Sequence, residues 1–185
     1  PPWSSRPLPA PRCGGSAGRA EAVIVIGVLA LLMVLLLVAN GTPVLLKRCM
    51  GRRWARPIDG GRMAWDGRPL LGHSKTWRGL VAGIGATALA TSVLGLGPAL
   101  GATIGAAALV GDLASSFTKR RLAIPSSGQA IGLDQIPEAL LPAIVARGAL
   151  GLGWLHVLLA PLVFLVAELL VSRLLHRLGI RDEPY

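Results

Sequence analysis

Apolar residues along the chain are gathered into long runs that alternate with polar, basic segments. The first run is unbroken from Ala22 to Ala39. Further apolar runs cover 80–97, 98–117, 138–152 and 154–175. A run of about 18 apolar residues or more predicts a helix that crosses a lipid bilayer. The pattern therefore predicts an all-α polytopic membrane protein with about five transmembrane helices, which form a single domain over residues 22–178.

The first run has a second interpretation, because Arg12 and Arg19 precede it as basic residues precede the core of a secretory signal peptide. Such cores span about 7–15 residues and lead to an A-x-A cleavage site, and neither feature is found here. We therefore favour a retained helix that ends at the polar break 40–43. Residues 1–21 are rich in Pro, Gly, Ser and Arg and predict a disordered tail, and 179–185 form a short C-terminal tail.

Basic residues lie almost entirely on one side of the predicted bundle. The loop 40–78 contains nine Lys and Arg residues, the loop 118–137 contains three, and the C-terminal end contains three more. Cytoplasmic segments of membrane proteins carry an excess of Lys and Arg. We therefore expect the N-terminus outside, the C-terminus in the cytoplasm, and a multi-pass protein of the cell (inner) membrane.

Composition supports lipid as the surrounding solvent. Hydrophobic residues make up 52% of the 185 residues and charged residues 15%, whereas soluble domains carry about 25% charge. A net charge of +10 would indicate nucleic acid in a soluble protein. In a membrane protein such charge meets lipid headgroups or phosphorylated substrates instead, so no nucleic-acid partner is expected. The two cysteines, Cys13 and Cys49, lack the Cys/His spacing of a zinc site.

The strongest candidate chemistry lies at the end of the third apolar run. Asp112 is an ionisable residue inside an apolar helix, a costly placement that marks a functional site by default. Ser116 and Lys119 follow at i+4 and i+7 and share its face, and Arg120 comes next. An acid, a hydroxyl and two cations on one face suit a site for a metal and a phosphate. The alternative is that Asp112 is only paired with a Lys or Arg of the same cluster.

Two other acids lie near helix ends. Asp134 opens the fourth helix and is either its N-cap or a second carboxylate for a divalent metal. Magnesium prefers carboxylate oxygens together with substrate phosphates and water. Glu168 lies near the cytoplasmic end of the fifth helix and is expected to snorkel or to pair with Arg173. We interpret Glu168 and His156 as structural residues.

The segment before the second apolar run combines two cations with two hydroxyls, Ser74, Lys75, Thr76 and Arg78. Such a set can clasp a phosphate chain, and the alternative is a basic membrane anchor.

Two polar residues of the same long loop have open roles. Asp59 lies in Pro57-Ile58-Asp59-Gly60-Gly61 and is either a turn residue or a substrate contact. Asn40 opens the polar break after the first run, where it either structures a site or ends the helix.

Taken in order, these segments resemble a known family of membrane enzymes. Gly111 to Arg120 resembles the G-D-x-x-x-S-x-x-K-R segment of the CTP:phosphatidate cytidylyltransferases, and His73 to Gly79 resembles their S-x-K-T-x-x-G segment. The small archaeal branch, the CDP-archaeol synthases, is closer still. Its motifs are matched in order by Asn40, Pro43 to Leu46, Pro57 to Gly61, Asp66 to Arg68, Gly72 to Gly79, Gly111 to Arg121 and Leu133 to Gln135.

The resemblance implies a magnesium-dependent nucleotidyltransferase of phospholipid biosynthesis. Such an enzyme transfers CMP from CTP to a lipid phosphate in the cytoplasmic leaflet and releases pyrophosphate. By position, Asp112 and Asp134 would hold Mg²⁺, with Lys119 and Arg120 as further catalytic residues. The residues that would contact phosphates or the nucleotide are Ser74, Lys75, Thr76, Arg78, Ser116, Asp59 and Asn40.

The chain also departs from the larger phosphatidate enzymes. It lacks their Lys-Asp pair and His-Gly-Gly turn, and Pro137 and Glu138 stand where a further Asp is expected. These departures motivate one alternative, a non-catalytic protein that binds anionic lipid. A composition rich in Ala, Gly and Arg, which is typical of bacteria, motivates another, phosphatidate cytidylyltransferase-type activity on a diacyl lipid. The sequence leaves the oligomeric state open, a homo-oligomer included.

Overall fold

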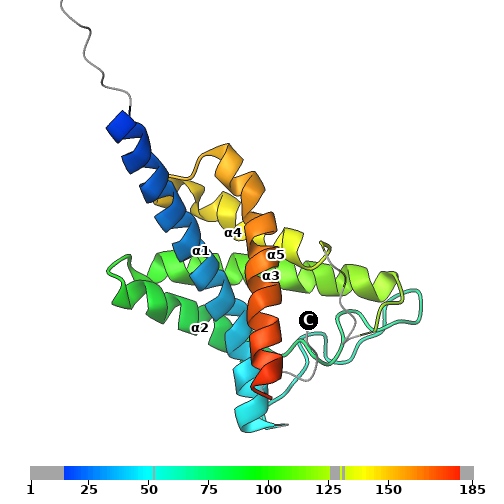
Figure 1. Cartoon of the computed structure of the whole chain (residues 1–185). Helices are drawn as coiled ribbons and strands as arrows, with labels where there is room; N and C mark the ends of the chain where they lie inside the picture. The colour runs from blue at the N-terminus through cyan, green and yellow to red at the C-terminus, as the bar shows by residue number, and fades with distance from the viewer. Residues whose placement is uncertain (1–14, 52, 126–129, 131, 180–185) are drawn as a thin grey trace, which may run out of the picture.

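The computed structural model describes residues 15–51, 53–125, 130 and 132–179. Within these residues the chain forms five helices and no strand, which confirms the all-α prediction (Figure 1). The helices are α1 (Gly15–Met50), α2 (Trp77–Val93), α3 (Pro98–Arg121), α4 (Gln135–Leu150) and α5 (Trp154–Arg177).

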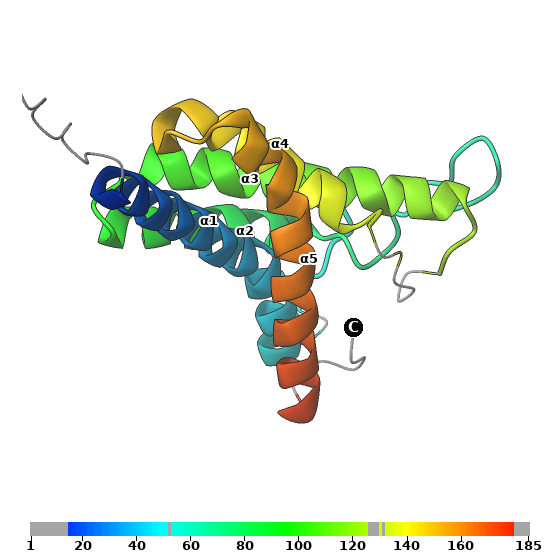
Figure 2. The same cartoon turned by 45° about the horizontal axis from the view of Figure 1, so that its top comes forward.

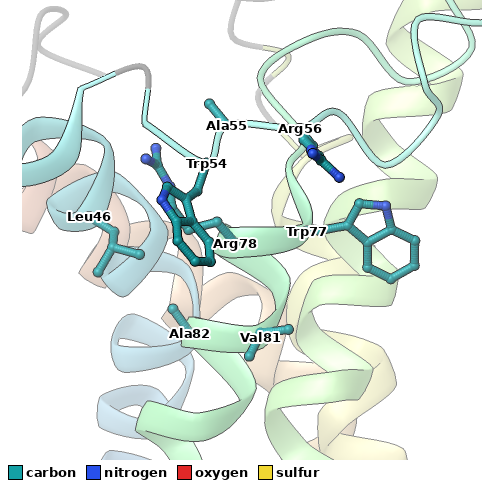
Figure 3. Close-up of a pocket in the computed structure, with 8 residues that line it drawn as sticks. All are labelled: Leu46, Trp54, Ala55, Arg56, Trp77, Arg78, Val81 and Ala82. Atoms are coloured by element: carbon teal, nitrogen blue, oxygen red, sulfur yellow. The ribbon is translucent and has the colours of Figure 1, made fainter.

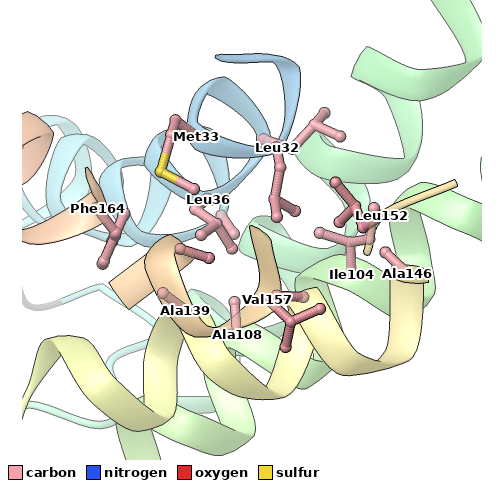
Figure 4. Packing of buried hydrophobic residues seen from close by; sticks show 14 residues of the cluster. Leu32, Met33, Leu36, Ile104, Ala108, Ala139, Ala146, Leu152, Val157 and Phe164 are labelled. Atoms are coloured by element: carbon pink, nitrogen blue, oxygen red, sulfur yellow. The ribbon is translucent and has the colours of Figure 1, made fainter. Parts of the chain in front are cut away.

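The helix α3 lies at the centre of the bundle. It packs between α2 and α4, while α1 crosses α2 and α3, and α5 packs against α4 and α1 (Figures 1 and 2). The core is apolar and joins α1, α3 and α5 through side chains such as Leu32, Leu36, Ile104, Val157 and Phe164 (Figure 4). Because lipid tails are as apolar as these side chains, close van der Waals packing is what holds the helices together here.

Small residues set the distances between the helices. A Cβ atom at Gly83 would lie 2.6 Å from the carbonyl oxygen of Ala39, and one at Gly101 would lie 2.3 Å from that of Thr87. No side chain fits at such distances, so glycine is what allows α1, α2 and α3 to approach closely.

The helix α1 does not end at the polar break, so that prediction is wrong. Pro43 lies inside α1, which continues to Met50. Proline has no N–H and leaves the carbonyl of Ala39 without its helical donor, but Gly83 of α2 packs against this carbonyl. Thr42 Oγ1 donates to the carbonyl of Val38 (2.6 Å). A neighbouring helix and a local hydroxyl therefore accommodate the proline, as in other membrane helices.

Other helix ends also differ from the predicted ones. Residues 15–21 are helical, so the predicted disordered tail is wrong there, and 1–14 lie outside the described residues. The helix α2 begins at Trp77 and ends at Val93, because Gly95 and Gly97 adopt positive φ values of 72° and 83°. The helix α3 extends beyond 117 to Arg121. The polar connections therefore cover 51–76 and 122–134.

Three helices within the described residues are long and apolar enough to cross a membrane: α1 over Glu21–Met50, α3 over Pro98–Arg121 and α5 over Trp154–Leu174. The remaining helices, α2 and α4, have 17 and 16 residues. At 1.5 Å per residue they rise about 24–26 Å, less than a hydrocarbon core of about 30 Å. A multi-pass protein is supported, whereas five complete spans and the orientation stay predictions.

The two ends of the bundle differ in character. The start of α1, the α2–α3 turn and the α4–α5 turn lie toward the upper left of Figure 1. The polar connection 51–76, the end of α3 and the end of α5 lie toward the lower right. This second end, which we call the loop end, contains almost all the candidate residues.

Candidate active site

The polar connection 51–76 is organised by one acid. Asp59 is buried, and its carboxylate accepts hydrogen bonds from the backbone N–H groups of Gly61, Leu71 and Gly72, each at 2.9 Å. Burial raises the pKa of this carboxyl, but the three N–H donors outweigh burial and the pKa is lowered. The bonds support the interpretation of Asp59 as a turn residue, and a substrate contact stays a prediction.

The connection is fastened to the end of α3 by Arg121. The guanidinium forms an ion pair with Asp66 and lies 5.4 and 5.1 Å from the ring centres of Trp65 and Phe117. In return, Arg68 donates to the carbonyl of Arg121. The segment Asp66–Arg68 and the end of α3 at Arg121 therefore hold each other in place.

The start of α2 is held by backbone and side-chain bonds. Ile58 N donates to the carbonyl of Lys75 (2.9 Å), and Trp77 N donates to that of Arg56 (3.1 Å). Thr76 is the N-cap, because its Oγ1 accepts a hydrogen bond from Gly79 N (3.2 Å). This contact accounts for the hydroxyl of Thr76, while Ser74 is exposed. The side chain of Lys75 is thereby presented to the bundle from a fixed backbone.

Lys75 pairs with Asp112 at the centre of the loop end. Its Nζ lies 2.6 Å from both carboxylate oxygens, and each side chain is 22% exposed. Burial lowers the pKa of Lys75, but Asp112, then Glu138 and Asp134, outweigh it and the pKa is raised. The ammonium therefore stays charged among three carboxyl groups. Asp112 is paired with a cation, as the alternative interpretation expected, but the partner comes from a different segment of the chain.

Glu138 was not among the residues that the sequence singled out. It is buried in the first turn of α4, accepts a hydrogen bond from Asn40 Nδ2 (3.2 Å), and lies within hydrogen-bonding reach of Asp112. One signal was available: Glu138 is four residues after Asp134 and so falls on the same helix face. Asn40 thus joins the polar cluster and does not end a helix.

Glycine allows α4 to bring Glu138 to Asp112. A Cβ at Gly111 would lie 2.3 Å from the carbonyl oxygen of Pro137 and 2.7 Å from the backbone nitrogen of Glu138. The residue before Asp112 must therefore be glycine for α3 and α4 to meet at this level.

A second ion pair lies beside the first. Lys119 Nζ is 2.8 Å from Asp134 Oδ1, and the side chains are 12% and 13% exposed. No hydrogen-bond donor in the described part of the chain is aligned with this oxygen, so the contact is electrostatic. Asp134 occupies the N-cap position of α4, as one interpretation expected, but its side chain makes no capping bond there. Its Oδ2 accepts from Ala130 N (3.2 Å) instead.

Arg120 is buried beside these pairs and is 6% exposed. It donates to the carbonyl of Ile124 and, with Arg68, lines a cavity of about 310 Å³. Its Nε is buried and has no hydrogen-bond partner among the described residues. Ser116 is fully buried one turn after Asp112. A buried cation with an unmet donor at the wall of a cavity is suited to an anion.

Arg78 lies elsewhere. Its guanidinium donates to the backbone carbonyls of Gly51 and Arg53 at the end of α1, and it lines a different, larger cavity. Lys75 and Arg78, three residues apart, thus belong to two different regions.

Glu168 and His156 have local roles. Gln135 Nε2 donates to Glu168 (2.8 Å), which replaces the expected pairing with Arg173. His156 Nδ1 accepts a hydrogen bond from Gly153 N (3.2 Å) at the start of α5, as a structural residue would.

The carboxylates of this end can be tested as ligands of a metal. No group of three or more His, Cys, Asp or Glu side chains in the described residues is arranged to hold a metal ion by itself. Asp112 and Asp134 are instead each engaged by a lysine. Carboxylates of this kind still fit magnesium, which is usually held by one or two carboxylates plus substrate phosphates.

Comparisons with known proteins point to one family. A family model described as CarS-like, CDP-archaeol synthase, matches residues 23–102 and 93–185. The CDP-archaeol synthase of Aeropyrum pernix is 37% identical over 163 residues, which cover 84% of this chain and 90% of that protein. The CDP-archaeol synthase of Thermococcus onnurineus is 41% identical over 109 residues. That match covers 53% of this chain and only 61% of the Thermococcus protein.

A solved structure is similar over most of the chain. It is described as an intramembrane enzyme for archaeal membrane lipids biosynthesis. The TM-score is 0.61 at 34% sequence identity, and the match covers 83% of this chain and 93% of that one.

Proposed function

The chain belongs to the CarS-like family of CDP-archaeol synthases, and from this membership we propose that it transfers CMP from CTP to the phosphate of a membrane lipid. The products are a CDP-activated lipid and pyrophosphate. The observation that carries the proposal is the pairing of Lys75 with Asp112, which unites two motifs 37 residues apart in the chain. Beside this pair lie Glu138 and the Lys119–Asp134 pair.

The reaction is an in-line attack of a lipid phosphate oxygen on the α-phosphorus of CTP. A P–O bond forms at that phosphorus as the bond to the pyrophosphate oxygen breaks, and no protein nucleophile is needed. Catalysis then depends on positioning and on charge neutralisation. Lys75, Lys119 and Arg120 supply the positive charge, since all three lie in or beside the polar cluster.

The cavity at Arg68 and Arg120 is the proposed place for phosphates of CTP. Its two arginines lie at the loop end, and the unmet Nε of Arg120 supplies a donor. Ammonium groups held by carboxylates in the free enzyme can exchange a carboxylate for a phosphate oxygen, because both are oxygen anions. The ion pairs thus keep Lys75 and Lys119 in position before substrate binds.

Asp112 and Asp134 are the proposed holders of Mg²⁺, which supplies neutralisation of phosphate oxygens when bound. Glu138 lies beside Asp112 and accepts a hydrogen bond from Asn40. Its role is to position Asp112: Asn40 holds Glu138, and Glu138 limits how the Asp112 carboxylate can turn toward α4.

We propose that the loop end faces the cytoplasm, where CTP is found, with the N-terminus outside. The excess of Lys and Arg at this end supports the orientation. The lipid phosphate then approaches from the cytoplasmic leaflet of the cell membrane.

The test is a panel of lipid phosphates incubated with labelled CTP, with ether-linked isoprenoid and ester-linked diacyl compounds side by side. We expect a CDP-lipid and pyrophosphate from at least one. Asp112→Asn should abolish turnover while the protein elutes as a folded species in detergent. Glu21→Gln, at the far end of α1, is the matched control and should remain active. Full activity in Asp112→Asn, or no product with any lipid phosphate, contradicts the proposal.

A further inference from the structure

A second cavity, larger than the one at Arg68 and Arg120, lies outside the polar cluster, between the end of α1, residues 54–56 and the start of α2. Its volume is about 940 Å³, within the range of small-molecule sites. Eight residues line it: Leu46, Trp54, Ala55, Arg56, Trp77, Arg78, Val81 and Ala82 (Figure 3). None of them is a carboxylate, and none belongs to the two Lys–Asp pairs.

The lining is divided by chemistry along the helix axis. Arg56 and Arg78 lie at the level of the polar connection, whereas Val81 and Ala82 lie one turn further into α2 (Figure 3). Leu46 completes the apolar part from α1. A ligand that fits this division has an anionic head and an apolar tail.

Two tryptophans, Trp54 and Trp77, belong to the lining and lie apart from each other in Figure 3, and they are 81% and 53% exposed. Tryptophan is enriched where a membrane protein crosses the headgroup level. Their position after the end of α1 and at the start of α2 therefore favours the headgroup level for the cavity.

Arg78 is held ready for an anion. Its Nη atoms donate to the carbonyl of Gly51 (3.2 and 3.3 Å), which fixes the guanidinium, while its Nε is buried and has no partner within the described residues. The guanidinium is thus a fixed positive charge at the wall of the cavity, and such a charge attracts a phosphate.

We propose that this cavity binds an anionic phospholipid of the surrounding bilayer, at a site separate from the reaction. The phosphate lies against Arg56 and Arg78 and one chain lies along Val81 and Leu46. The reacting lipid phosphate is a poorer occupant, because it must reach the cluster at Asp112, to which no lining residue belongs. The inference goes beyond the proposed transfer and does not depend on it.

The experiment measures lipid retention. The full chain is placed in phosphatidylcholine vesicles with a minor fraction of phosphatidylglycerol and extracted mildly, and native mass spectrometry counts the phosphatidylglycerol per chain. Arg56→Ala removes an exposed cation, and Val81→Trp fills the apolar part from an exposed position. The matched controls are Arg62→Ala, an exposed arginine of the same connection, and Val93→Trp at the other end of α2.

We expect the wild type to retain phosphatidylglycerol, and Arg56→Ala and Val81→Trp each to weaken retention about tenfold, the loss of one charge-assisted contact or of chain packing. The two controls and Asp112→Asn should retain it as the wild type does. Unchanged retention in Arg56→Ala and Val81→Trp overturns the proposal, as does an equal loss in Arg62→Ala.

Two further outcomes separate the sources of the phosphate. Displacement of the lipid by inorganic phosphate would show that the site takes a free anion, and loss of the lipid in Asp112→Asn would assign it to the reaction site. Either result overturns the proposal. A chain without transferase activity that still shows the expected retention pattern supports the lipid site and contradicts only the proposed function.

Discussion

Two regions at the loop end use the same basic segment in opposite ways. In the polar cluster, Lys75 and Lys119 are each bound to a carboxylate and are mostly buried. In the cavity at the start of α2, Arg78 donates to backbone carbonyls, and Arg56 and Arg78 share the lining with tryptophan and aliphatic side chains and with no acid. The first arrangement suits a group that must be positioned for chemistry, and the second suits a lipid that only has to be held. Position in the sequence does not separate them, because Lys75 and Arg78 lie within one turn of the helix start.

The largest expected effect comes from breaking the central pair of the cluster. Lys75→Met leaves the half-buried Asp112 without its cation, which we expect to cost about 1–3 kcal/mol of stability and all activity. The double variant Lys75→Met/Asp112→Asn should recover most of the stability but none of the activity. Thermal unfolding in detergent and CDP-lipid formation measure the two effects. Equal stability of the single and double variants would contradict the coupling.

Moving α3 and α4 apart should affect the cluster and spare the cavity. Gly111→Ala places a methyl group 2.3 Å from the carbonyl oxygen of Pro137, and we expect about 1–3 kcal/mol of destabilisation with a large loss of activity. Gly85→Ala is the matched control, since a Cβ there meets nothing within 4 Å. Phosphatidylglycerol retention should be normal in both. An active Gly111→Ala enzyme would show that close approach of α4 is not needed.

Asp59 supports both regions, because it organises the connection that carries Arg56 and Lys75. Asp59→Asn weakens three backbone hydrogen bonds to a charged group, and we expect a loss of about 1.5 kcal/mol. The pKa of Asp59 is lowered below its ordinary value of about 3.9, so its contribution is fully present above that value and is lost as the pH falls through the lowered pKa.

The stability difference between wild type and Asp59→Asn should therefore be constant from neutral pH down to about pH 4 and shrink below it. Unfolding midpoints measured over this range test the sign. A difference that grows as the pH falls would contradict the assignment.

The smallest expected effect is at the shared helix start. Thr76→Ala removes the N-cap of α2 and should cost about 1 kcal/mol, with a modest loss in both activity and lipid retention. Thr76→Ser should behave like the wild type, because it keeps the capping hydroxyl. A loss of activity far beyond the loss of stability would instead indicate that the hydroxyl contacts a phosphate.

Much of the site could be expected from local pattern. Asp112 in an apolar helix, the cations after it and the hydroxyl-rich segment at Lys75 were all recognisable in the sequence, because an isolated charge among apolar residues is costly. Glu138 was missed, since a first-turn acid is common at any helix start, and only the packing at Gly111 brings it to Asp112. Asn40 was ambiguous for a similar reason, because local rules treat an Asn-Gly-Thr-Pro run as a break.

The sequence by itself determined the helical class, the number of helices, the family and the gathering of basic residues at one end, since each follows from the order and spacing of residues. Only the tertiary structure decided that α1 continues through Pro43, because Gly83 of the neighbouring helix packs against the carbonyl that the proline leaves free. It also decided which cation meets which carboxylate: Lys75 with Asp112, Lys119 with Asp134, and Arg78 with neither. Such partners are set by how closely helices approach, and that distance depends on contacts between residues far apart in the chain.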